Sequence, residues 1–472
     1  MFDFMSFIPI IAAAGGGGSS SGGSGGGGGL FYLGVLIGYI PMHLLGRKMR
    51  IDKKKHKDDT GWWRSRQMLV WIVGLLYMII LIAIGLIVAF TIRSGIIAMV
   101  LIIAGPCSMV GAGAGLYNWF GKFNRSKKED AELKASGWNE EALIKGAEQI
   151  FLAYQRDWSM NNVAPMSAYL SPYYLGHAQC MVTALWQMGR RNDVRNVVIE
   201  EAIITEVNQD PNGVNDTVTI GFTAKADDAI VDLRTNSVIA PNPSIIEEQW
   251  IFMRFGNEWR LNGILPATAN INTMNASLMN FALQNGMYYS LDWGWLLLPQ
   301  RGWLFKNGKF GVSDVNNHCI GWIKGTFDNI LTQIYTYNPN ANTQYAQSYI
   351  IAQATLPRSY GDILVLRRKA LTKAHGLREV STEWQDFNKA YRVFATSAEQ
   401  ATSLELLNPK YMEQLAAVPF EVNIEVVDNV LYIFSPLAWN QKANVKFHAT
   451  DKVKYYQTLL WLLHAAFKEM KM

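Results

Sequence analysis

The stretch QWIFMRFGNEWRLNGIL, residues 249–265, decides the fold of the soluble part of this 472-residue chain. Apolar side chains recur at alternate positions on both sides of Gly256-Asn257, which is the pattern of two β-strands joined by a tight turn. We expect strands over residues 246–255 and 259–265. Because so short a turn joins antiparallel neighbours, the pair predicts an antiparallel sheet.

The same sheet extends toward the N-terminus and is preceded by helices. Alternating apolar residues predict three further strands, over 197–207, 218–222 and 230–239. Upstream the apolar spacing becomes helical: Asn139 can cap a first helix, a short helical stretch follows Pro165, and a third helix spans 174–188. Helices followed by an antiparallel meander indicate an α+β domain.

Three motifs within residues 141–266 carry a resemblance to a known family. They are AYQRDW at 153–158, AYLS at 168–171, and the strand pair QWIFMRF and WRLNGI at 249–255 and 259–264. Together they resemble the C-terminal domain of the membrane-tethering subunit of the mitochondrial presequence translocase, the Tim-forty-four (Tim44) family, and its bacterial relatives.

The resemblance implies a nuclear-transport-factor-two-like cone, in which helices and a curved antiparallel sheet enclose a deep apolar pocket. Members of the family bind membranes and protein partners, and a mitoribosomal relative docks the ribosome on the membrane. The charged, chaperone-recruiting N-terminal region of the mitochondrial protein has no counterpart here, so the resemblance does not extend to protein import. We assign the cone to residues 139–268.

Aromatic side chains in the cone have two readings, because they can fill its core or line its pocket and contact a partner. The candidates are Tyr154, Trp158, Tyr169, Trp186 and Trp250. Core packing is the plainer reading, since large aromatic residues dominate the interiors of domains. We expect Arg254 and Arg260, on neighbouring strands, to pair with carboxylates such as Glu247 or Glu258.

Residues 30–120 form the expected membrane region. Uncharged apolar spans at 30–46, 69–92 and 95–120 have the lengths of transmembrane helices, which need about 20 residues. Lys/Arg-rich segments at 47–68 and after residue 121 place the soluble domains on the cytoplasmic side of the cell membrane. No Asp, Glu, Lys or Arg lies inside these spans, which argues against a transporter and for an anchor.

Two features of this region predict contacts. Gly111 and Gly115 have the spacing of a close helix-packing motif, either within the chain or between two copies as a homo-oligomer. Lys53, Lys54, Lys55 and Lys57 are candidates for contact with lipid headgroups. The basic charge is concentrated here: residues 1–128 carry a net charge of +10 and the remainder −5. An acidic soluble part argues against nucleic acid as a partner.

The segments flanking the membrane region are simple. Residues 1–29 combine an apolar N-terminus, which a cleaved signal would also explain, with a spacer of almost pure Gly and Ser. Residues 121–138 are expected to form a basic linker to the cone.

A second β-rich α+β module follows the cone. We expect a connecting helix in residues 269–294, the module itself at 295–440, and an apolar C-terminal helix in 441–472. That helix can dock on the soluble body, lie on the membrane or bind a partner. Residues 383–393 and 407–412 resemble a bacterial domain of unknown function found in membrane-anchored proteins, which implies architecture but no activity.

Catalytic and metal-binding motifs are absent from the sequence. The three cysteines are scattered, and His177 with Cys180 shares a helix face without a third group. Asp157 is the one acid in the family motif of the first helix and would be the base of an enzyme. We therefore expect no cofactor, and a non-enzymatic membrane-tethered scaffold that binds a lipid, peptide or protein. The alternatives are an enzyme acting on an apolar substrate in the cone, or an accessory subunit of a transport or secretion complex.

Overall fold

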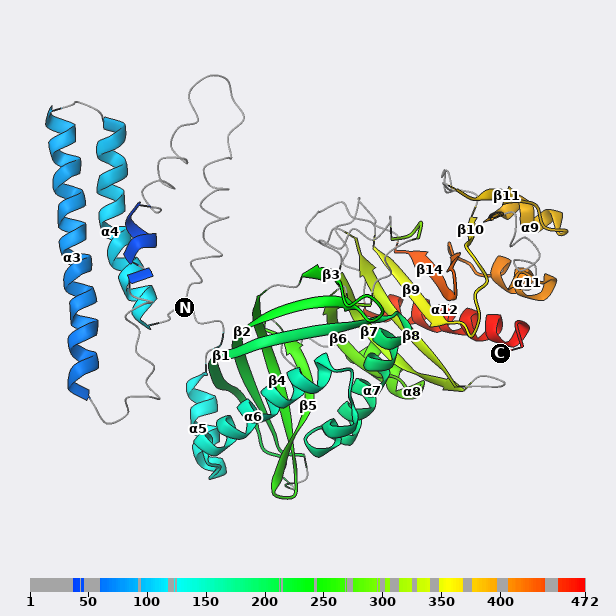
Figure 1. Cartoon of the computed structure of the whole chain (residues 1–472), viewed down its shortest axis with the longest axis horizontal. Helices are drawn as coiled ribbons and strands as arrows, with labels where there is room; N and C mark the ends of the chain where they lie inside the picture. Colours follow the sequence, from blue (N-terminus) through cyan, green and yellow to red (C-terminus); the bar gives the residue numbers. More distant parts are fainter. Residues whose placement is uncertain are drawn as a thin grey trace. The chain divides into compact units, whose positions relative to one another are not determined.

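The computed structural model describes the chain in two compact units, Met1–Lys122 and Phe123–Met472, drawn in Figure 1. The described residues are 37–42, 44–45, 60–91, 95–117, 123, 125–211, 213, 215–241, 244–267, 269, 275–294, 296–297, 302–305, 314–324, 329–339, 348–367, 376–396, 406–437 and 449–471.

The first unit contains two long apolar helices, α3 (Thr60–Thr91) and α4 (Gly95–Tyr117). Within the described residues one stretch, Met68–Thr91 in α3, is long and apolar enough to cross a membrane. The apolar stretch in α4, Ile96–Val110, is shorter than the roughly 20 residues that a span requires. The expectation of three membrane helices is therefore not confirmed. Of the first expected span, residues 37–42 and 44–45 are helical.

Small residues set the contact between α3 and α4. A Cβ added to Gly105 would lie 2.9 Å from Ile82, and one added to Gly85 would lie 3.1 Å from Ile102. The two helices thus approach closely within one chain. Gly111 and Gly115 lie on α4, but their contacts fall outside the described side chains, as do residues 1–29 and the lysines at 53–55 and 57.

The cone begins at Phe123, whose buried ring packs against Gly221 on the outer face of the sheet. Its helical elements are α5 (Lys127–Ser136), α6 (Glu140–Ser159), the 3-10 helix η1 (Ala164–Ala168) and α7 (Pro172–Gln187). Asn139 caps α6 as expected, accepting a hydrogen bond from the Ala142 N–H at 3.0 Å. Residues 127–136, expected within a linker, are helical, and Leu133 of α5 is buried in the core of the cone.

The strands of the cone form an antiparallel sheet. They are β1 (Arg190–Asn208), β2 (Thr217–Asp232), β3 (Val238–Pro241), β4 (Ile245–Phe255) and β5 (Glu258–Pro266). The sheet order is β1-β2-β4-β5, with β3 paired to β2. Residues 249–265 form the expected hairpin of β4 and β5, in which Trp250 faces Ile264. The third expected strand, 230–239, is instead the end of β2 followed by a turn into β3.

The second module is built on a larger antiparallel sheet, with the order β11-β12-β10-β13-β14-β9-β8-β7-β6 among the described strands. Their bounds are β6 (Tyr288–Gly294), β7 (Asp314–Lys324), β8 (Asn329–Asn338), β9 (Tyr349–Thr355), β10 (Ile363–Arg367), β11 (Arg378–Val380), β12 (Tyr391–Ala395), β13 (Asn423–Val427) and β14 (Val430–Pro436). Its helices are α8 (Ala276–Gln284), α9 (Gln385–Ala390), α11 (Pro409–Ala416) and α12 (Ala449–Glu469).

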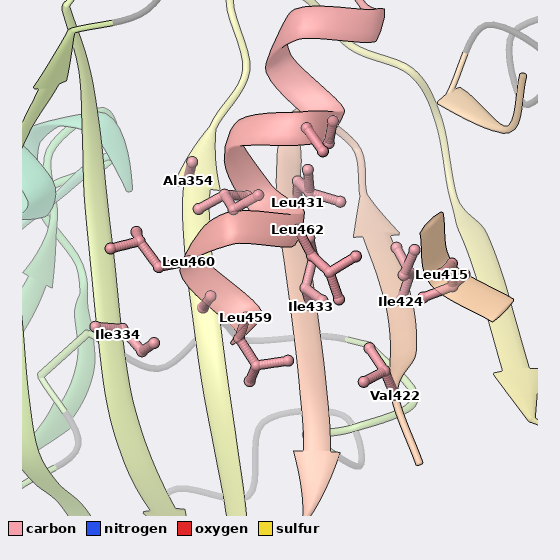
Figure 2. Close-up of a cluster of buried hydrophobic side chains, with 14 of the residues drawn as sticks. Ile334, Ala354, Leu415, Val422, Ile424, Leu431, Ile433, Leu459, Leu460 and Leu462 are labelled. Carbon is pink, nitrogen blue, oxygen red and sulfur yellow. The ribbon is translucent and has the colours of Figure 1, made fainter. Parts of the chain in front are cut away.

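The C-terminal helix α12 packs against this sheet, which is one of the three alternatives expected for it. Figure 2 shows Leu459, Leu460 and Leu462 above the strands that carry Ile334, Ala354 and Ile433. These leucines expose at most 4% of their surface, so the apolar face of α12 is buried in the core of the second module.

One segment of the second module differs from expectation. The connecting segment is helical only over α8, and residues 288–294 form β6 at the edge of the second sheet. Residues 303–305 form a turn, and residues 306–313 lie outside the described part of the chain. Tyr288, Tyr289 and Trp293 are of residue types that favour strands, and the segment pairs with β7.

Candidate functional site

An apolar pocket of about 370 Å³ opens at one end of the cone, and we call it the open-end pocket. Its walls come from the first half of α6, from β2 and β4, and from the β4–β5 turn. The lining residues are Trp138, Asn139, Ala142, Leu143, Gly146, Ala147, Ile150, Val218, Ile220, Phe252, Arg254, Asn257 and Trp259. A volume of this size accommodates a small apolar group.

Small side chains on α6 leave this space unfilled. Ala142, Gly146 and Ala147 recur at helical spacing on the face that meets the sheet. A Cβ added at Gly146 would meet nothing within 4 Å. One turn further along, Phe151 fills the same face, stacking on Phe222 at 4.7 Å between ring centroids. The pocket therefore ends where the large side chains of α6 begin.

The rim combines two indoles with one guanidinium. Trp138 and Trp259 meet edge to face with their ring centroids 4.8 Å apart. Arg254 donates from Nε to the Gly256 carbonyl at 2.9 Å, and its Nη1 lies 3.4 Å from the Asp216 carboxylate. Arg254 thus pairs with Asp216 rather than Glu247, whereas Arg260 pairs with Glu258 at 3.0 Å as expected.

The five predicted aromatic residues lie elsewhere in the cone, and none is among those that line the open-end pocket. Tyr154, Trp158 and Trp250 are core residues with at most 4% of their surface exposed. Trp250 packs against Phe151 and Tyr154 at 4.6 and 5.3 Å between centroids. These rings form part of the core of the cone.

Tyr169 and Trp186 have different positions. The Tyr169 hydroxyl donates to Asp157 Oδ2 at 2.9 Å, and the Arg156 Nε donates to Oδ1 at 2.8 Å. The Asp157 carboxylate is thus buried and doubly engaged, and it does not line the pocket. Trp186 is 67% exposed near the end of α7, where it could contact a partner but not a ligand inside the cone.

The opposite end of the cone is polar, which the sequence pattern did not predict. Glu248 lies on the same face of β4 as Trp250 and accepts a hydrogen bond from that indole at 2.9 Å. Burial raises the pKa of Glu248 to about 7, and the bond from Trp250 offsets only part of this effect. Asn192 joins the Trp158 indole to the Asp228 carboxylate, at 3.1 and 2.5 Å.

The second module covers this polar end, which we call the sealed end. Leu297, Ile320 and Leu331, all from the second module, belong to the core cluster of the cone. The buried Arg190, at the start of β1, donates to the Leu296 carbonyl at 3.3 Å, and burial lowers the pKa of this guanidinium to about 10. The contact closes the cone with apolar side chains and one buried charge.

A row of buried polar side chains crosses the second sheet from this junction. Its members, one per strand from β13 to β6, are Glu425, Tyr432, Gln353, Gln333, His318 and Ser290. The row reaches α7 of the cone, where the Ser290 hydroxyl lies 2.9 Å from His177 Nε2. Burial lowers the pKa of His177 to about 3 and that of His318 to about 4, so both imidazoles are neutral at physiological pH.

At the far end of the row, Glu425 holds the 303–305 turn against the sheet. Its carboxylate accepts hydrogen bonds from the backbone N–H groups of Trp303 and Leu304, the latter at 2.9 Å. Burial raises the pKa of Glu425 to about 7. The polar groups of the second module thus fasten backbone and sheet to each other. Within the described residues no three His, Cys, Asp or Glu side chains gather closely enough to hold a metal ion.

Comparison with known proteins confirms the family indicated by the motifs: residues 129–265 match the model of the Tim44-like domain. Among solved structures, the crystal structure of the mycobacterial trehalose monomycolate transport factor A, TtfA, is 14% identical, and the alignment covers 42% of this chain and 95% of that one. Its TM-score of 0.28 is too low to carry an argument. No curated protein matches the chain. The resemblance expected for residues 295–440 is not confirmed.

Proposed function

We propose, from the premise that residues 129–265 form a Tim44-like domain, that this chain is a non-enzymatic, membrane-tethered scaffold. Its apolar helix α3 supplies the anchor, and the basic segments beside the anchor favour a cytoplasmic position for the soluble unit. The open-end pocket binds an apolar group, either the chain of a lipid or an apolar side chain of a peptide or protein partner.

The composition of the pocket carries this proposal. Of its lining side chains, Arg254 is the one that bears a charge, and it sits at the rim in an ion pair with Asp216. Walls without an acid or an imidazole can hold an apolar group but offer no proton donor or acceptor for chemistry. The guanidinium and the two rim indoles would contact the polar end of an amphiphile or the backbone of a peptide.

A crosslinking experiment on the full chain in nanodiscs tests the proposal. A fatty acid that carries a diazirine in its chain is the probe, and we expect its crosslinks on residues 142–150 of α6. Gly146→Leu fills the pocket, so it should reduce crosslinking several-fold. Gln149→Leu places the same side chain on the exposed side of α6 and is the matched control. Equal crosslinking in all three proteins would refute a ligand in this pocket.

A second experiment separates a lipid from a protein partner. A photoreactive amino acid at Asn257, on the rim, should capture a partner in intact cells if the pocket receives a protein segment. A recurrent partner lost on Gly146→Leu supports a scaffold, and a subunit of a transport or secretion complex among the captured proteins supports that alternative.

The enzyme alternative would place chemistry at Glu248, the one inward carboxyl of β4. Glu248 and Phe252 of the pocket are four positions apart, about 13 Å along a strand, and the Trp250 side chain lies between them. A substrate in the open-end pocket therefore does not reach Glu248 in this conformation. Turnover abolished by Glu248→Gln would overturn the scaffold proposal.

A further inference from the structure

The outward side of α12 carries a stripe of exposed residues that the packing of the second module does not use. Its members, which we call the α12 stripe, are Lys454, Gln457, Trp461, His464 and Lys468. Their spacing of three or four residues aligns them along one side of the helix. The opposite side holds Leu459 and Leu462, buried against the sheet (Figure 2).

Trp461 is the unusual member of the α12 stripe, since its indole is 48% exposed at the centre of a polar line. Tryptophan flanked by lysines is the composition of segments that lie at a membrane–water interface, where the ring sits among headgroups. The carboxylate nearest the stripe in sequence, Glu469, is held by Lys410 at 2.9 Å and by Asn408 at 3.3 Å. It also interacts electrostatically with Lys468 and offsets part of that charge, whereas Lys454 lies at the opposite end of the stripe.

We propose that the α12 stripe rests on anionic lipid headgroups of the bilayer that anchors the chain. Each lysine close to an anionic surface strengthens such a contact roughly five-fold. The anchor also holds the helix near the surface at an effective concentration on the order of millimolar, so a weak contact suffices. Because the apolar side of α12 is committed to the core, the contact is with headgroups and is sensitive to salt. It is independent of what the open-end pocket binds.

The test measures the accessibility of the stripe in the full chain. The variant His464→Cys places a thiol between Trp461 and Lys468 and keeps both. It is reconstituted in nanodiscs of phosphatidylcholine, with or without phosphatidylglycerol, and its reaction with a water-soluble maleimide is timed. The chain without the added thiol supplies the background from Cys107, Cys180 and Cys319, of which the last two are buried.

We expect labelling at position 464 to be several-fold slower in the anionic discs, and high salt or the pair Lys454→Glu and Lys468→Glu to restore the fast rate. Trp461→Ala should restore it in part. A thiol at the exposed Gln179 of α7 is the control for position, and Lys145→Glu on α6 is the control for charge. Neither control should respond to the lipid. Equal rates in the two kinds of disc, or slowing that survives the lysine reversal, would overturn the proposal.

Discussion

The two ends of the cone are built from the same sheet and have opposite characters. At the open end, small residues of α6 face Val218, Ile220 and Phe252 across empty space. At the sealed end, Leu297 and other side chains of the second module join the core of the cone, and Glu248 accepts a hydrogen bond from the Trp250 indole. One strand serves both ends: the inward residues of β4 change from Glu248 through Trp250 and Phe252 to Arg254.

The difference between the open and the sealed end limits where a ligand could enter this cone. An isolated cone would expose its polar end to water, whereas here Leu297 packs into its core and the Leu296 carbonyl accepts a hydrogen bond from Arg190. The proposed ligand is therefore left with the apolar end. Trp250 divides the two ends, since it is fully buried and contacts rings from both α6 and β2. The two ends can therefore be tested by removing Trp250, which divides them, by removing Leu297, which plugs the sealed end, or by changing the chemistry at either end.

Removing Trp250, which divides the two ends of the cone, should have the largest effect. Trp250→Ala deletes a fully buried indole, and such changes cost about 3–5 kcal/mol in the free energy of unfolding. Chemical unfolding of the reconstituted chain, followed by circular dichroism, measures the loss. The variant should also extend crosslinking by the fatty-acid probe from α6 toward Glu248. Unchanged stability would mean that Trp250 does not separate the two ends.

Removing Leu297, which plugs the sealed end, should have the next largest effect. Leu297 is fully buried in the core of the cone, so Leu297→Ala should lower the free energy of unfolding by about 2–5 kcal/mol. Hydrogen exchange should rise at the sealed end of β1 and β4 and not at the open end. Leu283→Ala, at a side chain that is 73% exposed, is the matched control and should change stability by no more than about 0.5 kcal/mol. Equal effects at both ends would contradict a local plug.

The chemistry of the sealed end predicts a dependence on pH. The pKa of Glu248 is about 7 in the folded chain against an ordinary value of 4.5, so the folded state binds the proton more tightly. The stability gained from this proton is complete below pH 4.5 and is lost as the pH rises through 7. Glu248→Gln should remove a slope of the order of 1–3 kcal/mol over this window. Unfolding at several pH values measures it, with Glu247→Gln as the control, and an unchanged slope would argue against burial of the carboxyl.

The smallest expected effect is an increase in the free energy of unfolding. Gly146→Leu replaces a glycine inside α6 where the new side chain meets open space, and glycine in a helix interior costs about 0.5–1 kcal/mol. The variant should therefore be more stable by about that amount while it binds less of the apolar probe. A loss of stability would show that the open-end pocket is tighter than the described contacts indicate.

Local signals made much of the cone predictable. The hairpin at 249–265, the cap at Asn139 and the order of helices before strands follow from turn residues, capping and periodicity, which act over a few positions. The motifs indicated the family that the comparison of residues 129–265 then confirmed. The helical segment 127–136 was hidden by its charge, since only Leu133 is buried in the core.

The candidate site was less predictable because it depends on contacts between distant segments. Large aromatic residues suggested a pocket, but Tyr154, Trp158 and Trp250 fill the core, and the pocket is left by Ala142, Gly146 and Ala147. A cavity left by small side chains has no strong signal in the sequence. Glu248 could have been predicted as an inward residue, because it lies two positions from Trp250 and alternate residues of a strand share one face.

The contact between Phe123 and Gly221 has a mechanical consequence. Tension transmitted along the chain from α3 and α4 would enter the second unit at Phe123, which packs on β2, a strand hydrogen-bonded to β1 on one side and to β4 on the other. Two ladders must then yield together, whereas a pull on an edge strand would break bonds one at a time. Arg125 adds a clamp to Glu140 and Asp130 at 2.8 and 2.6 Å. A partner that pulls on the proposed scaffold would therefore apply force at a central strand, where two sets of backbone hydrogen bonds oppose separation.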